Sequence, residues 1–142
     1  MKDTFSKVKG MEFPRYVQVG HGILDGLVQL CKDLQFHKTG MIITGGQTYK
    51  TAGKTVEQIM RDAGYSISVH MTGATTEENV DDAIAVGTER KAKFILGVGG
   101  GSKIDASKLV AANLGIPFIS IPTSAAHDGI ASGRASLKLD RG

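Results

Sequence analysis

Residues 94–108 read Phe94-Ile-Leu-Gly-Val-Gly-Gly-Gly-Ser-Lys-Ile-Asp-Ala-Ser-Lys108, and no other part of the chain is as informative about the fold. An apolar run, which predicts a strand, ends in three consecutive glycines, and a helical pattern begins directly after them. Glycine lets the backbone bend sharply and bring its N–H groups close to a ligand, because it has no Cβ. The following helix presents further N–H groups and its positive dipole end at the same place. The stretch therefore predicts a phosphate-binding turn between a strand and a helix.

Patterns typical of strands and helices alternate along the rest of the chain. We expect strands at 16–19, 40–44, 65–71, 94–98 and 116–121, and helices at 23–34, 51–63, 75–90 and from the glycine triplet to Gly115. This alternation is typical of βαβ units, which form a parallel sheet with helices on both faces. The expected fold class is therefore α/β, with a Rossmann-like parallel sheet. Residues 134–140 alternate like a further strand and indicate a continuing hairpin.

Three of the expected strands end in residues suited to ligand binding. These ends read Thr-Gly-Gly at 44–46, Gly-Gly-Gly-Ser at 99–102 and Pro-Thr-Ser at 122–124. Parallel sheets bind ligands at the carboxyl ends of their strands. We therefore expect the three segments to meet at one ligand-binding edge.

The composition excludes several classes of function. Of the 142 residues, 41% are apolar and 22% are charged, as in an ordinary globular domain. The net charge is only +3 and the basic residues are scattered, whereas nucleic-acid binding needs a concentrated basic face. We therefore expect no nucleic-acid partner, and a small anionic molecule as the ligand of a mildly basic cleft.

The sequence also bears on the location of the protein. No apolar run approaches the ~20 residues that cross a bilayer, and residues 1–11 lack the apolar core of a secretory signal. Cys31 is the single cysteine, so it cannot form an internal disulfide, which fits a reducing compartment. We expect a cytoplasmic protein without membrane insertion, with Cys31 as a small buried apolar residue.

Two motifs resemble those of a known family. Residues 99–108 resemble the G-G-G-S-x-x-D-x-x-K motif of the iron-containing alcohol dehydrogenase and dehydroquinate synthase-like superfamily. Residues 121–132, Ile-Pro-Thr-Ser-Ala-Ala-His-Asp-Gly-Ile-Ala-Ser, followed by Arg-Ala-Ser at 134–136, are more specifically similar to the archaeal-type sn-glycerol-1-phosphate dehydrogenases. The opening at 13–20 is similar to the first strand of that family, so the resemblance covers the chain from Phe13 onward.

The resemblance implies an activity and a domain organisation. Members of that family reduce dihydroxyacetone phosphate with NADH or NADPH, which makes the sn-glycerol-1-phosphate backbone of archaeal membrane lipids. They have an N-terminal nucleotide-binding α/β domain, here residues 13–142 after an extension at 1–12, and a helical C-terminal domain that this sequence does not contain. They usually associate, so we expect a homo-oligomer.

The resemblance also implies a catalytic zinc, held by one aspartate and two histidines of the helical domain. The histidines of this chain lie scattered in separate loops or strands: His21, His37, His70 and His127. We therefore expect no metal ligands and no catalytic residues in this chain. By itself the chain should bind nucleotide weakly and should not catalyse the reaction.

Cofactor binding is expected at seven consecutive residues of the glycine turn: Gly99, Gly100, Gly101, Ser102, Lys103, Ile104 and Asp105. Residues 101–105 would face the cofactor pyrophosphate through their backbone N–H groups, while Gly99 and Gly100 would shape the turn. The alternative is a turn that serves only close packing of strand and helix, but three glycines exceed what such a turn needs. Asp105 is expected in the first helical turn, where a structural role at the helix start is as plausible as ligand contact. Lys108, one turn further on, either offsets pyrophosphate charge or is solvated.

The resemblance assigns further contacts to the segment after the last expected strand. The cofactor contacts, toward the nicotinamide half, are Thr123, Ser124, Ala125, Ala126 and Ser132. Asp128 matches the family position that contacts substrate, where it would orient hydroxyl groups. A plain Ser/Thr turn is the alternative for Thr123 and Ser124, and a loop cap is the alternative for Asp128.

Gly45 and Gly46 bear on the choice between the two nicotinamide cofactors. Sheets selective for NAD usually place Asp or Glu after the second strand, where it binds the ribose 2′-OH of the adenosine. The chain has glycines at that position, followed by Lys50, so no carboxylate would repel a 2′-phosphate. NADP(H) should be accepted at least as well as NAD(H), unless the two glycines form only a tight turn.

Two other functions remain open from the sequence. The first is another polyol or alcohol dehydrogenase, or a dehydroquinate synthase-like lyase, of the same superfamily. The second is a non-catalytic nucleotide-binding or regulatory module. The favoured function is reduction of dihydroxyacetone phosphate, with this chain as the cofactor-binding part.

Overall fold

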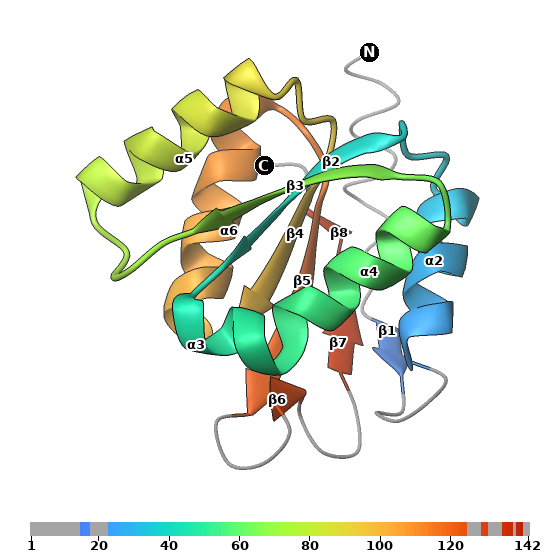
Figure 1. The fold of residues 1–142 in the computed structure, drawn as a ribbon. Helices are drawn as coiled ribbons and strands as arrows, with labels where there is room; N and C mark the ends of the chain where they lie inside the picture. Colours follow the sequence, from blue (N-terminus) through green and yellow to red (C-terminus); the bar gives the residue numbers. More distant parts are fainter. Residues whose placement is uncertain (1–14, 18–22, 125–128, 131–134, 138, 141–142) are drawn as a thin grey trace.

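A computed structural model describes residues 15–17, 23–124, 129–130, 135–137 and 139–140 (Figure 1). The expected extension at 1–12 lies outside these residues. In chain order the elements are β1 (Arg15–Val17), α2 (Ile23–Asp33), β2 (Thr39–Thr44), α3 (Gly46–Thr48), the π-helix η1 (Tyr49–Gly53), α4 (Lys54–Asp62), β3 (Ser66–Met71), α5 (Glu77–Glu89), β4 (Ile95–Gly99), α6 (Gly101–Leu114), β5 (Phe118–Ser124), β6 (Gly129–Ile130), β7 (Ala135–Leu137) and β8 (Leu139–Asp140).

Four parallel strands form the main sheet, in the order β3-β2-β4-β5. The short strands β6 and β8 pair antiparallel with β5, while β1 pairs antiparallel with β7 in a separate two-stranded sheet. The chain runs from β2 outward to β3 and then crosses back over β2 to β4. The direction of winding therefore reverses between β2 and β4.

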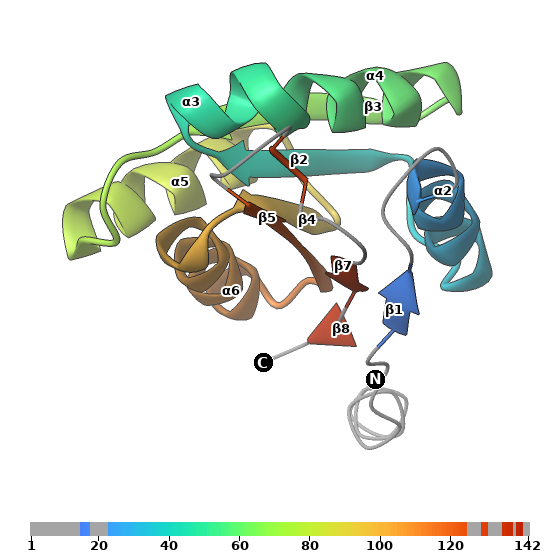
Figure 2. The ribbon, with the colours of Figure 1, turned by 90° about the horizontal axis from the view of Figure 1, so that it is seen from below.

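Helices cover both faces of the parallel sheet, as the sequence predicts (Figure 2). Side chains alternate between the faces along each strand, because successive Cβ atoms point to opposite sides. Ile42 and Leu96 pack toward α2 and α4, whereas Met41 and Ile95 pack toward α5 and α6. Phe94 lies at the centre of the first cluster, stacked on Phe36 with ring centroids 5.0 Å apart.

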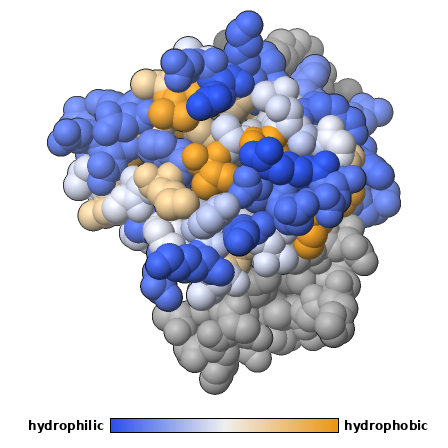
Figure 3. Space-filling view, viewed as in Figure 1, coloured by the Kyte–Doolittle hydropathy of each residue, from blue (hydrophilic) through white to orange (hydrophobic). Residues whose placement is uncertain are grey.

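The surface is mostly hydrophilic on the face that Figure 3 shows, with small apolar areas between the charged groups. The exposed large apolar side chains among the described residues are Met71 and Leu109. Within the same ranges, none of the helices combines the length and apolar composition that crossing a bilayer requires.

Local signals explain where the helices around the sheet begin and end. Gly115 ends α6 with φ +69°, a left-handed conformation that glycine adopts without a steric penalty. Thr76 caps α5, because its Oγ1 accepts a hydrogen bond from the backbone N–H of Asn79. The spacing of Thr75 and Glu78 predicts a capping box one residue earlier, and that prediction is wrong.

Two predicted strands differ in the structure. The strand expected at 16–19 is the short β1, and it does not join the parallel sheet, because its partner is β7. The strand expected over 134–140 is described as two short pieces that pair with different strands, β7 with β1 and β8 with β5. The helix expected to begin at Thr51 is preceded by α3 and η1, so helical structure begins directly after β2.

Candidate functional site

The carboxyl ends of β2, β4 and β5 meet at one edge of the sheet. Pairing of Gly99 with Pro122 aligns the ends of β4 and β5, and pairing of Ile43 with Gly97 aligns β2 beside them. The three marked segments therefore lie together, as expected. Their meeting point includes the place where the winding reverses, which is where open α/β sheets bind ligands.

The fold itself requires glycine at some positions of the turn but not at others. A Cβ on Gly97 would lie 2.6 Å from Ser107 Oγ, and Gly99 has φ +149° and would place a Cβ 2.8 Å from Lys103 Cγ. A Cβ on Gly100 or Gly101 would meet no described atom within 4 Å, and neither residue has the positive φ that favours glycine. These two glycines leave open space over the turn, as close approach of a ligand requires.

The helix that follows opens its N-terminus at the same place. Gly100 is the N-cap of α6 and has no side chain to cap it. The first backbone N–H groups of the helix that form hydrogen bonds are those of Lys103 and Ile104. Both donate to the Gly100 carbonyl, at 3.1 Å. The N–H groups of Gly101 and Ser102 precede them and have no partner within the helix. Turn and helix together can hold a phosphate group through backbone N–H groups.

Lys103 extends from this helix across the strand ends. Its Nζ donates to the Gly73 carbonyl at 2.7 Å and lies 3.5 Å from Ser102 Oγ. In the same region Thr75 Oγ1 donates to the Ser102 carbonyl at 2.7 Å. The loop after β3 is therefore tied to the start of α6 by two hydrogen bonds. Gly73 and Thr75 are not among the residues predicted for the site, because nothing in the local sequence pattern indicates a contact 27 to 30 residues away.

One residue of the predicted phosphate motif, Asp105, lies differently from expectation. Asp105 is exposed and stands beyond the first turn of α6, since the helix begins at Gly101 and has no acidic residue in that turn. The expected position of Asp105 in the first turn is therefore wrong. Ile104 is half-buried and packs against the core on the α5–α6 side. Whether either residue contacts a cofactor stays a prediction.

The predicted residues after β5 are only partly described. Thr123 and Ser124 end β5, where they pair with Ile130 and Gly129 of β6. Thr123 is half-buried at the same edge as the glycine turn. Four candidates lie outside the described residues: Ala125, Ala126, Asp128 and Ser132. Their predicted roles remain predictions.

Gly45 and Gly46 follow β2, which is the first strand of the parallel sheet and not the second, since β1 lies outside it. The comparison with the second strand of NAD-selective sheets therefore needs correction. Because β2 is the neighbour of β4, Gly45 still lies beside the glycine turn, and a Cβ on it would lie 2.6 Å from Lys103 Cε.

A metal site does not emerge from the described residues. They bring together no group of three His, Cys, Asp or Glu side chains that could hold an ion. These residues by themselves therefore do not fit a metal ion.

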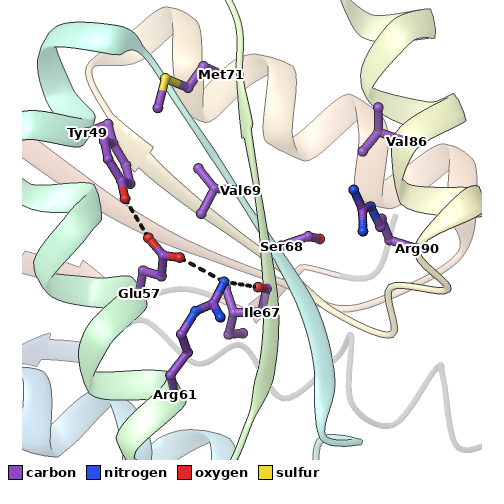
Figure 4. A pocket seen from close by; sticks show the side chains of 9 residues that line it. All are labelled: Tyr49, Glu57, Arg61, Ile67, Ser68, Val69, Met71, Val86 and Arg90. Atoms are coloured by element: carbon purple, nitrogen blue, oxygen red, sulfur yellow. Dashed lines mark hydrogen bonds and ion pairs between the residues drawn. The ribbon is translucent and has the colours of Figure 1, made fainter.

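A hollow of about 350 Å³ lies away from the glycine turn, along the outer edge of β3 (Figure 4). A chain of hydrogen bonds runs along it. Tyr49 Oη donates to Glu57 at 2.6 Å, Arg61 pairs with Glu57 at 2.8 Å, and Arg61 Nη2 donates to the Ile67 carbonyl at 2.7 Å. The hydrogen bond to the Glu57 carboxylate raises the pKa of Tyr49. This network joins the edge strand to α4.

The geometry defines an α/β protein whose parallel sheet carries a glycine-rich, phosphate-suited turn where its winding reverses. Residues 18–142 match the family model described as iron-containing alcohol dehydrogenase. The chain belongs to the iron-containing alcohol dehydrogenase family.

Similar proteins support this placement. The chain is 45% identical over 144 aligned residues to a glycerol-1-phosphate dehydrogenase [NAD(P)+] of Methanosarcina mazei, covering 100% of this chain and 40% of that protein. It is 40% identical to the protein of the same name from Thermoplasma volcanium, covering 94% of the chain and 38% of that protein. The chain thus spans about 40% of the length of the curated relatives it matches.

Solved structures show the same fold. An iron-containing alcohol dehydrogenase matches with a TM-score of 0.64 at 19% identity, covering 80% of this chain and 38% of that one. Glycerol dehydrogenase of Schizosaccharomyces pombe matches with a TM-score of 0.63 at 16% identity, covering 72% and 26%. At these identities the match supports the fold alone.

Proposed function

We propose that this chain is the cofactor-binding part of an NAD(P)H-dependent dehydrogenase that interconverts dihydroxyacetone phosphate and sn-glycerol 1-phosphate. One structural observation carries the cofactor half of the proposal. Gly100 and Gly101 leave open space in front of the start of α6, although the packing of the described residues does not require glycine at either position. The 45% identity to a relative named for this activity supports the substrate.

The cofactor pyrophosphate would lie over this turn. The N–H groups of Gly101 and Ser102 would donate to its oxygens, and the dipole of α6 would stabilise its negative charge. The dinucleotide would then extend across the strand ends in both directions, with Thr123 and Ser124 beside the nicotinamide half. Asp128 would orient the substrate hydroxyl groups. The cofactor carries the chemistry, and this chain positions it.

When bound, the reduced nicotinamide would supply a hydride from its C4 to the ketone carbon of dihydroxyacetone phosphate, and the ketone oxygen would take up a proton. The products are NAD(P)⁺ and glycerol 1-phosphate. The zinc that the resemblance implies would be held by residues other than those described here. A cytoplasmic homo-oligomer that supplies membrane lipid synthesis is the setting that this function predicts.

The test is turnover by the protein at its full natural length. Purified protein is given dihydroxyacetone phosphate with NADPH or NADH, cofactor oxidation is followed by absorbance, and the product is identified as sn-glycerol 1-phosphate or its 3-phosphate mirror image. We expect the 1-phosphate. Oxidation with a simple polyol or alcohol substrate but not with this pair would show another activity of the same family.

A variant pair links turnover to the glycine turn. Gly101→Ala places a methyl group in the space proposed for the pyrophosphate, so we expect KM for the cofactor to rise at least tenfold, roughly the loss of one charge-assisted hydrogen bond. Gly115→Ala, at the opposite end of the same helix, is the control. If both variants raise KM equally, the turn is not the cofactor site.

A further inference from the structure

Among the described residues, Lys103 places a charged side chain across the candidate site. It is the third residue of α6, and its side chain turns back over the preceding strand ends. Cβ and Cγ lie 2.9 and 2.8 Å from where a Cβ on Gly99 would stand, and Cε lies 2.6 Å from the corresponding point on Gly45. The side chain thus runs from β4 to β2, and its Nζ ends on the Gly73 carbonyl after β3.

The position of this ammonium group bears on cofactor choice, because dinucleotide-binding sheets distinguish NADP from NAD by the charge beside the adenosine ribose. Dinucleotide-binding α/β sheets bind the adenosine ribose with an acidic side chain, or accommodate a 2′-phosphate with a nearby basic group. The strand of the glycine turn, β4, has two neighbours, β2 and β5. Because the nicotinamide half is proposed to lie beside Thr123 and Ser124 of β5, the adenosine half is left to β2. Gly45 directly follows β2, which ends at Thr44. Lys103 Nζ lies 3.6 Å from the Cβ position of Gly45. A positive charge therefore occupies the space into which a carboxylate would extend.

The charge balance of Lys103 points to an anion. A cation in the first turn of a helix is disfavoured by the helix dipole. The groups that Nζ contacts, the Gly73 carbonyl and Ser102 Oγ, are both uncharged. A phosphate bound beside the ammonium would neutralise it, and Lys103 retains donor capacity for one, because an ammonium has three N–H bonds.

The geometry points to Lys103 as the specificity-determining residue that binds the 2′-phosphate of NADP(H). This inference rests on the proposed function and deepens it. The pyrophosphate would lie on Gly101 and Ser102, and the adenosine half would extend over β2, with its ribose above Gly45. Gly45 would be glycine so that the Lys103 side chain can pass over it.

The test compares two cofactors on Lys103→Gln in the protein at its full natural length. Dissociation constants for NADP⁺ and NAD⁺ are measured by calorimetry, with 2′-phospho-ADP-ribose and ADP-ribose as matched probes without the nicotinamide. We expect binding of the two 2′-phosphorylated ligands to weaken about tenfold, the loss of one charge-assisted hydrogen bond, and the other two to change less than about twofold. Lys103→Arg, which keeps the charge, should retain the preference.

Three controls separate this role from others. Thr75→Val removes the other hydrogen bond between the β3–α5 loop and α6 without removing a charge. Lys93→Gln removes an exposed charge before β4. Lys50→Gln removes the other positive charge after β2 that could bind the 2′-phosphate. Equal weakening of all four ligands in Lys103→Gln, or the same selective loss in any control, would overturn the role of Lys103. Failure of the unchanged protein to bind ADP-ribose would instead overturn the proposed function.

Discussion

The glycines of the strand–turn–helix segment at 94–108 look alike in the sequence, but the physical reason for having glycine differs from one position to the next. Gly97 is glycine because Ser107 and Phe118 pack against its backbone, and Gly99 is glycine because its φ is +149°. Gly100 and Gly101 meet neither condition. The same residue type thus serves packing at position 97 and leaves open space four residues later, at position 101.

This division predicts opposite effects of two alanine substitutions. Gly97→Ala should lower the free energy of unfolding by about 1–3 kcal/mol, because the new methyl group overlaps Ser107 and the Phe118 ring. Gly101→Ala should leave it unchanged or raise it by about 0.5–1 kcal/mol, because alanine favours the helix. Urea denaturation measures both. A strongly destabilised Gly101→Ala would show that the turn is closed by other parts of the protein.

Cys31 predicts a pH dependence of stability. The thiol is fully buried, and its desolvation raises its pKa from 9.0 to about 12. Between these values the unfolded chain releases a proton that the folded chain keeps, so stability is complete below pH 9 and falls as the pH rises, by at most ~1.4 kcal/mol per unit. Unfolding followed from neutral pH to just below the titration of tyrosine measures this. In Cys31→Ala the free energy of unfolding should no longer fall with pH in this range. If it falls as steeply as in the unchanged protein, other titrating groups cause the decrease.

At the scale of single elements, the edge strand β3 is held by side chains of α4. The carbonyl of Ile67 receives the Arg61 guanidinium, and Arg61 is in turn held by Glu57. Edge strands expose unpaired backbone groups, and a charged side chain placed on them blocks pairing with other chains. The network in Figure 4 joins the edge strand to α4, and we expect it also to protect that edge from pairing with other chains.

Arg61→Met should remove this protection at modest cost. The guanidinium is about half-exposed, so we expect a loss of about 1 kcal/mol or less in the free energy of unfolding. Methionine keeps an unbranched side chain but cannot donate to the Ile67 carbonyl. Light scattering during mild heating should show earlier association than in Gln58→Met, an exposed position on the same helix. Equal association of the two variants would contradict a protective role.

At the scale of the whole molecule, the site is a product of topology. The reversal of winding between β2 and β4 leaves an opening at the strand ends, and α6 points its N-terminus into it. The loop after β3 reaches the same place and is tied there by Thr75 and Lys103. Segments around residues 45, 73, 100 and 123 thus contribute to one edge.

Ligand binding at this edge should stabilise the folded chain as a whole. Residues 1–142 with ADP-ribose at about 100 times its dissociation constant should gain about 2.7 kcal/mol in the free energy of unfolding. Thermal unfolding with and without the ligand measures this, with ribose 5-phosphate as the control for a single phosphate. An unfolding temperature that does not move with ADP-ribose would place nucleotide binding elsewhere.

The sequence by itself determined the fold class, the positions of the four parallel strands and the edge at which the candidate site lies. It could do so because apolar periodicity, glycine turns and helix ends such as Gly115 are local signals, read within a few residues. It also predicted burial of Cys31 from its place on the apolar face of a helix. The family followed from short motifs for the same reason.

Only the tertiary structure decided the strand order, the separate pairing of β1 with β7 and the path of Lys103. Strand order depends on which strands pair across the crossovers, and several orders bury the same apolar residues. The contacts of Lys103 with Gly45 and Gly73 join segments that are 30 or more residues apart. Their energies come from geometry that exists only once the sheet has formed, so no local pattern could reveal them.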